Sequence, residues 1–188
     1  MKIGLFGGSF DPIHNSHLKI INEVLNERLV DEVWIVPCGN HVFGKEMTDS
    51  KSRIEMIDLA INKNNRIKVK MLEINSNKPS YAIDTVNAMK SQFPEHKFYF
   101  IAGTDIVGDF EKWYRFEELA ENVEFILHQR ESYSIDGGSV MKIKAVLKSK
   151  VDNISSSEIR ERIKKNLDVS ELLPEKVLDY INKRGLYK

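Results

Sequence analysis

The sequence contains a single cysteine, Cys38, among its 188 residues. One cysteine excludes an intramolecular disulfide and any metal site built from several cysteines. Lysine plus arginine and aspartate plus glutamate both number 28, so the net charge is zero. The broad basic field that holds a nucleic-acid backbone is therefore not evident. No segment approaches the length of a membrane span. We expect a cytoplasmic protein that binds neither a membrane nor nucleic acid.

What the sequence does contain is an alternation of strand-like and helix-like segments. The spacing of apolar residues predicts strands at 2–7, 32–37, 66–74, 97–103, 122–128 and 141–147. Helical spacing and end signals predict helices at 15–27, 51–62, 80–93 and 155–166, and a last helix from Pro174 to just before Gly185. Residues 38–50 have the composition of a loop.

This order predicts an α/β fold, a Rossmann-like doubly wound parallel sheet with helices on both faces. We expect one domain over residues 1–188, with a small helical part at about 155–188. Ligands of such sheets bind at the carboxyl ends of the strands, where the strand order reverses. Candidate functional residues should therefore follow the predicted strands.

The first candidate is the string GGSFDPIHNSH at residues 7–17, between a predicted strand and a predicted helix. Glycines let the backbone approach a phosphate, and a helix N-terminus favours an anion. His14 and His17 are three residues apart, so both can face one ligand from the first helical turn. Two surface histidines after a plain turn are the alternative, but the complete string favours a phosphate site.

The second candidate is ISSSEIR at residues 154–160. Amides and hydroxyls at a helix start, with Arg160 one turn later, form a possible second anion site. A capped surface helix explains this motif equally well when it is taken alone. The presence of two possible anion sites in one chain is better explained by binding of a triphosphate than by coincidence.

These motifs carry a resemblance to a known family. GGSFDPIHNSH resembles the GxFDPxHxGH motif of the nucleotidyltransferase superfamily, although Ser16 stands where the family usually has glycine. ISSSEIR is similar to that family's ISSTxIR element. SYAIDT at 80–85, GTD at 103–105 and KWYR at 112–115 resemble elements of the nicotinate-nucleotide adenylyltransferase branch. The loop at 40–45 departs from the branch, because it lacks that branch's usual prolines.

The resemblance implies roles for particular residues. The ATP-binding residues it implies are Gly7, Gly8, Ser9, Phe10, His14, His17, Gly103, Asp105, Ile154, Ser155, Ser156 and Arg160. The implied residues for a pyridine mononucleotide are Tyr81, Asp84, Thr85, Thr104 and Trp113. Two further candidates for this substrate come from the residues themselves, as phosphate contacts: Lys45, in the departing loop, and Arg130, at the end of a predicted strand. A solvent-exposed lysine is the alternative for Lys45. His14, His17 and Arg160 would be catalytic, and no residue is assigned as a metal ligand.

The implied reaction is transfer of AMP from ATP to nicotinate mononucleotide, with Mg²⁺ accompanying ATP, in NAD biosynthesis. A transferase acting on phosphopantetheine or making CDP-linked head groups would share the first motifs but not Tyr81, Asp84 or Trp113. A nucleotide-binding module without turnover would use the same groups. A dehydrogenase is disfavoured because GGSFDP lacks the GxGxxG spacing. The oligomeric state is left open.

Overall fold

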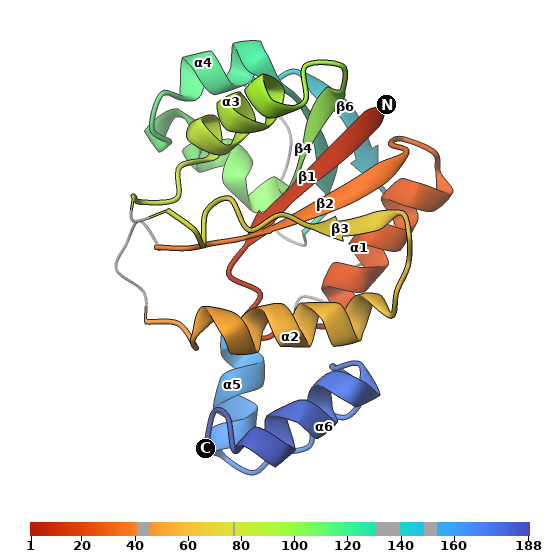
Figure 1. Cartoon of the computed structure of the whole chain (residues 1–188), viewed down its shortest axis with the longest axis vertical. Helices are drawn as coiled ribbons and strands as arrows, with labels where there is room; N and C mark the ends of the chain where they lie inside the picture. The colour runs from red at the N-terminus through yellow and green to blue at the C-terminus, as the bar shows by residue number, and fades with distance from the viewer. Residues whose placement is uncertain (41–45, 77, 131–139, 149–153) are drawn as a thin grey trace.

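The computed structural model covers residues 1–188 and describes all of them except 41–45, 77, 131–139 and 149–153. The described residues form one six-stranded sheet in the order β3-β2-β1-β4-β5-β6 (Figure 1). All neighbouring strands pair in parallel. The strands are β1 (Lys2–Gly8), β2 (Glu32–Pro37), β3 (Ile67–Val69), β4 (Lys97–Gly103), β5 (Glu124–His128) and β6 (Ile143–Leu147).

Helices cover both faces of this sheet, which confirms the predicted doubly wound fold. On one face the sheet shares a hydrophobic core with α1 (Asn15–Asn26) and α2 (Ser50–Ile61), and α5 (Ser156–Lys164) and α6 (Glu175–Arg184) extend this core. The other face packs against α3 (Ala82–Gln92), the 3₁₀ helix η1 (Thr104–Lys112) and α4 (Phe116–Asn122). In Figure 1, α5 and α6 form the predicted helical C-terminal part, beyond α2.

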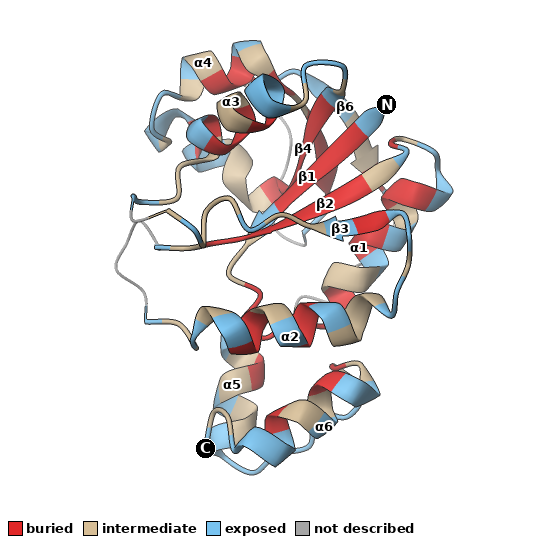
Figure 2. Cartoon of the chain, viewed as in Figure 1, coloured by how far each residue is buried: buried red, intermediate tan, exposed pale blue. Residues whose placement is uncertain are grey.

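The central strands read as continuous apolar runs because both of their faces are buried. In β2, Val33 and Ile35 enter the core beneath α1 and α2, while Trp34 and Val36 enter the opposite core. Figure 2 shows the same burial along the middle of the sheet. The chain moves from β1 outward to β3 and then returns to β4 on the other side of β1. The strand order therefore reverses between β1 and β4.

Several sequence-based boundaries were wrong. The strand predicted at 66–74 ends at Val69, because the chain then turns and the Asn75 amide donates to the Met71 carbonyl. Ser80 does not cap α3: Tyr81 is the N-cap, and the Ser80 hydroxyl accepts from the Gly39 amide instead. Helices η1 and α4 were not predicted.

Other helix ends follow the predicted signals. The Ser155 hydroxyl accepts from the Glu158 amide at the start of α5, and Gly185 ends α6 with a positive φ of 64°. Pro174 is the N-cap of α6 rather than its first residue. Among the described residues, no helix combines the length and apolar character needed to cross a membrane.

Candidate active site

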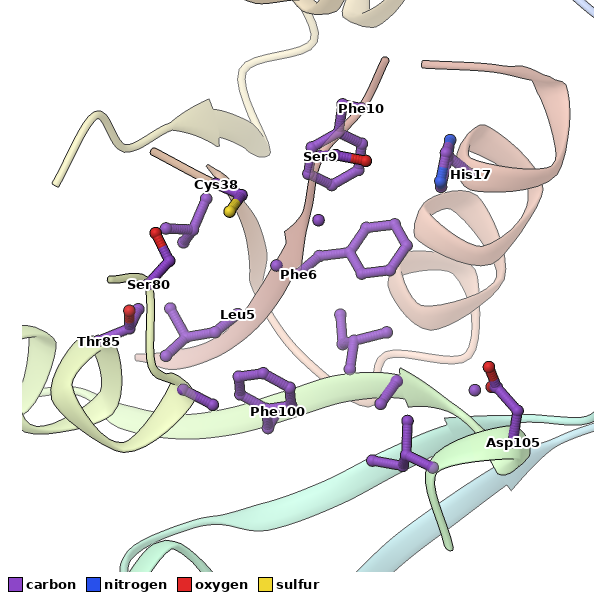
Figure 3. A pocket seen from close by; sticks show the side chains of 18 of the residues that line it. Leu5, Phe6, Ser9, Phe10, His17, Cys38, Ser80, Thr85, Phe100 and Asp105 are labelled. Atoms are coloured by element: carbon purple, nitrogen blue, oxygen red, sulfur yellow. The ribbon is translucent and has the colours of Figure 1, made fainter. Parts of the chain in front are cut away.

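A cavity of about 890 Å³ lies at the carboxyl ends of β1, β2, β4 and β5, where the strand order reverses. This is the position that parallel sheets use for ligands, and the volume is within the usual range for ligand pockets. Figure 3 shows His17 on α1 at one side of the cavity and Ser80 and Thr85 at the other.

Most of the residues predicted for the site line this cavity. They are Gly7, Gly8, Ser9, Phe10, His14, His17, Tyr81, Thr85, Gly103, Asp105, Trp113, Arg130 and Ile154. The predicted residues that are not part of its lining are Asp84, Thr104, Ser155, Ser156 and Arg160. Lys45 lies outside the described residues.

The two motif histidines lie against each other at the start of α1. Their rings are stacked with centroids 3.7 Å apart. The His14 amide donates to Nδ1 of His17 at 3.2 Å. An accepting Nδ1 places the proton of the neutral His17 ring on Nε2. His17 therefore presents its Nε2–H as a donor. The hydrogen bond from the His14 amide to Nδ1 fixes the orientation of the ring.

Both histidines are neutral near pH 7. Burial, followed by the charge of Arg130, lowers the pKa of His14 from 6.5 to about 4. Burial also holds the pKa of His17 well below 6.5, and His14 is the next largest cause. A phosphate in the cavity would therefore meet neutral imidazole donors rather than two imidazolium ions.

Arg130 and Lys112 are cationic residues of the described lining, and Nε of Arg130 lies 3.4 Å from Asp105 Oδ1. The Arg130 amide donates to Thr104 Oγ1 at 3.0 Å, so Thr104 supports Arg130 from outside the lining. His128, at the end of β5, also lines the cavity and is a functional candidate that sequence reasoning missed. Its place at a strand end was the one available signal.

The opposite side of the cavity is aromatic. Trp113 packs against Phe110, with ring centroids 5.9 Å apart, and Tyr81 lies 4.4 Å from Tyr114. The Thr85 hydroxyl donates to Oε1 of Glu73 at 2.5 Å. Glu73 was missed by sequence reasoning; it lines the cavity, and burial raises its carboxyl pKa. This side offers flat surfaces for a ring and polar groups at its edge.

Asp84 was predicted to contact the substrate, but it does not line the cavity. It is exposed and lies 3.8 Å from Arg115 Nη1. It occupies the first turn of α3, where a helical residue next to the buried Thr85 faces a different direction.

The start of α5 contacts the segment at residues 7–14, which leads from the end of β1 to α1 and is called the glycine-rich loop below. The start of α5 itself does not contact the cavity. The Ser156 hydroxyl donates to the Pro12 carbonyl at 3.0 Å, and Nη1 of Arg160 donates to the Asp11 carbonyl at 2.8 Å. Ser155 caps its own helix. Of the ISSSEIR motif, only Ile154 reaches the lining.

Comparison with known proteins places this site in a family. Residues 5–162 match the cytidylyltransferase-like family. The nicotinate-nucleotide adenylyltransferase of Bacillus subtilis (strain 168) is 38% identical over 189 residues, covering 100% of this chain and 98% of that protein. The chain belongs to the cytidylyltransferase-like family. Another relative is the probable nicotinate-nucleotide adenylyltransferase of Clostridium tetani. It is 34% identical, and the match covers 100% of this chain and 99% of that protein.

A solved structure has the same fold as this chain. It is the Plasmodium falciparum nicotinic acid mononucleotide adenylyltransferase complexed with NaAD, with a TM-score of 0.86 and 28% identity. The match covers 99% of this chain and 97% of that one. Among the described residues of the present family member, no group of three or more His, Cys, Asp or Glu side chains could hold a metal ion.

The buried histidines of this cytidylyltransferase-like protein predict a loss of stability in acid. His14 and His128 have pKa values of about 4 in the folded chain, against an ordinary value of 6.5. Between these values the unfolded chain binds more protons than the folded one, so protonation favours unfolding. We expect the free energy of unfolding, measured by urea titration, to fall as the pH drops from 6.5 toward 4. His128→Gln should reduce that slope, and an unchanged slope would contradict the assignment.

Proposed function

We infer that this protein transfers AMP from ATP to nicotinate mononucleotide, releasing pyrophosphate and nicotinate adenine dinucleotide in NAD biosynthesis. The observation that carries the inference is the composition of one cavity at the switch point of the sheet. One side holds the glycine-rich loop and the stacked His14 and His17, and the other holds Trp113, Tyr81 and Thr85. The names of the full-length relatives agree with it.

The chemistry needs no protein nucleophile. An oxygen of the mononucleotide phosphate attacks the α-phosphorus of ATP, the bond from that phosphorus to the β-bridging oxygen breaks, and pyrophosphate leaves with the electron pair. The attacking oxygen is already anionic at neutral pH, so no general base is required. The barrier consists of bringing two anions into line and stabilising the charge that develops.

We assign these tasks to His14, His17 and Arg130, which line the cavity, and to Arg160, which holds the adjacent loop. The Nε2–H of His17 and the ring of His14 donate to phosphate oxygens, and Arg130 supplies a positive charge. Arg160 acts by holding the loop through the Asp11 carbonyl. Mg²⁺ enters with ATP, because phosphate oxygens and water are ligands that Mg²⁺ prefers. Lys45 remains a proposed phosphate contact.

The pocket suits a pyridine carboxylate because the two aspartates of its lining are paired with cations, and because Glu73 accepts from Thr85 and has its carboxyl pKa raised by burial. A carboxylate needs N–H or O–H donors and no unpaired facing anion. Asp105 lies 3.4 Å from Nε of Arg130, and Asp109 lies 2.5 Å from Nζ of Lys112. We propose that the acid mononucleotide is preferred over the amide for this reason.

A cosubstrate panel tests the function. Pyrophosphate release is measured with Mg²⁺–ATP and, in turn, nicotinate mononucleotide, nicotinamide mononucleotide, phosphopantetheine or no acceptor. We expect release with the pyridine mononucleotides, and a higher kcat/KM for the acid form. Release with phosphopantetheine alone would indicate the sister transferase, and ATP binding without release would indicate a module without turnover.

Trp113→Ala should weaken binding of the pyridine substrate while leaving KM for ATP nearly unchanged. Aromatic stacking contributes about 0.5–1.5 kcal/mol, so KM for nicotinate mononucleotide should rise roughly 2–13-fold. Trp113→Phe keeps a ring against Phe110 and Phe100, and it should recover most of the loss. Equal increases in both KM values, from initial-rate kinetics, would remove Trp113 from the pyridine side.

A further inference from the structure

The last residues of the chain reach the glycine-rich loop. The Tyr187 hydroxyl donates to Oδ1 of Asp11 at 2.6 Å, across 176 positions of sequence. Asp11 is buried and Tyr187 is half-buried. Burial, and then the Asp11 carboxylate, raise the pKa of the Tyr187 phenol far above its ordinary value. The hydroxyl therefore keeps the proton that it donates.

The backbone at Tyr187 indicates that this contact is held in place by its surroundings. Its φ of 66° lies in the left-handed region, which bulky side chains seldom adopt. Such a conformation persists where neighbouring contacts determine it. The preceding residue contributes one of these contacts, because the Leu186 amide donates to the Ile181 carbonyl at 3.1 Å.

Asp11 is bound at both carboxylate oxygens, since Oδ2 accepts from the Thr48 amide at 3.1 Å. The backbone around it is anchored as well. Nη1 of Arg53, a buried residue of α2, donates to the Ser9 carbonyl at 2.9 Å. The Asp11 and Pro12 carbonyls are bound by Arg160 and Ser156, as described above.

These contacts hold the loop through residues that do not line the cavity. Ser9, Phe10 and His14 line the cavity, whereas Asp11 and its partner Tyr187 are not among the lining residues. An Asp11 carboxylate turned into the cavity would oppose a triphosphate, because like charges repel. Donors on both of its oxygens keep the carboxylate on the outer side.

We propose that Tyr187 is a positioning residue for adenylyl transfer: its hydroxyl holds Asp11 and thereby aligns the loop that carries His14. The proposal rests on the proposed function. It makes the C-terminal tail part of the catalytic unit, although Tyr187 touches no reacting atom. Small displacements of aligning groups lower the chemical step more than they weaken binding at a distant subsite.

The test is Tyr187→Phe, which removes only the hydroxyl. The matched control is Tyr180→Phe, on α6, whose hydroxyl donates to Glu55 at 2.9 Å and does not contact the loop. We expect kcat to fall about tenfold in Tyr187→Phe, with KM for nicotinate mononucleotide unchanged. Tyr180→Phe should keep the wild-type kcat. Thermal unfolding of each variant establishes that the assay temperature lies below its Tm.

A double-variant cycle with Asp11→Asn separates positioning through Asp11 from a general structural effect. If the hydroxyl acts through Asp11, the double variant should have a kcat within about twofold of the slower single variant. The proposal would be overturned if the fold-losses of kcat in the two single variants multiplied in the double variant. An unchanged kcat in Tyr187→Phe would also overturn it. Absence of turnover in the wild-type enzyme would instead contradict the proposed function, so the two failures are distinguishable.

Discussion

Replacing His17 by alanine should lower kcat about 10²–10³-fold, the range observed when a donor aimed at transition-state charge is removed. The reason is specific to its geometry. Nδ1 of His17 accepts the His14 amide, so Nε2 carries the proton that can be donated to phosphate. Because the pKa of His17 lies well below 6.5, this donor is present unchanged across neutral pH.

Steady-state kinetics with ATP and nicotinate mononucleotide measure this effect. KM for the mononucleotide should change little, since Thr85 lies at the other side of the cavity from His17. His96→Ala is the matched control, because His96 packs against Trp34 and Phe93 and is not among the residues that line the cavity. A kcat within about twofold of wild type for His17→Ala would exclude His17 from the chemistry.

Gly39→Ala should destabilise the protein and damage the pyridine side together. A Cβ at Gly39 would lie 2.1 Å from the carbonyl oxygen of Glu73 and 2.7 Å from its carbonyl carbon. Both are backbone atoms, so the turn that carries Glu73 must move. Overpacking of this kind costs about 1–3 kcal/mol, and each kcal/mol lowers Tm by roughly 2–4 °C in a chain of this size.

The functional effect follows from the hydrogen bonds around Glu73. Its carboxylate accepts from the Thr85 hydroxyl, and the Gly39 amide donates to Ser80. We expect KM for nicotinate mononucleotide to rise more than KM for ATP. Gly108→Ala is the control, because a Cβ there meets no atom within 4 Å. A Tm for Gly39→Ala equal to that of Gly108→Ala would contradict the predicted clash.

The fold and half of the site could be predicted because their signals are contiguous in sequence. The string from Gly7 to His17 contains its strand end, turn and helix start together, and the structure places its histidines side by side at the cavity. The sheet was predictable because its central strands are buried on both faces. The strand at 66–74 was predicted too long because alternation alone does not reveal the turn after Val69.

The rest of the site could not be predicted, because it depends on contacts between segments that are distant in sequence. Glu73 meets Thr85 only after the turn beyond β3 folds beneath Gly39. Arg160 was correctly placed one turn into a helix, but its direction toward the Asp11 carbonyl depends on how α5 packs. Tyr187 lies near the end of the chain, and no local pattern connects it with Asp11. The roles assigned to these residues stay predictions until the variants are measured.

The most direct test of the account follows the oxygen atoms of the mononucleotide. Nicotinate mononucleotide carrying ¹⁸O in its non-ester phosphate oxygens is incubated with enzyme, Mg²⁺ and unlabelled ATP. The ¹⁸O content of both products is then measured by mass spectrometry. Direct attack on the α-phosphorus predicts nicotinate adenine dinucleotide that retains all of the label, including the bridging oxygen, and pyrophosphate that contains none. Labelled pyrophosphate, or no dinucleotide at all, would contradict it.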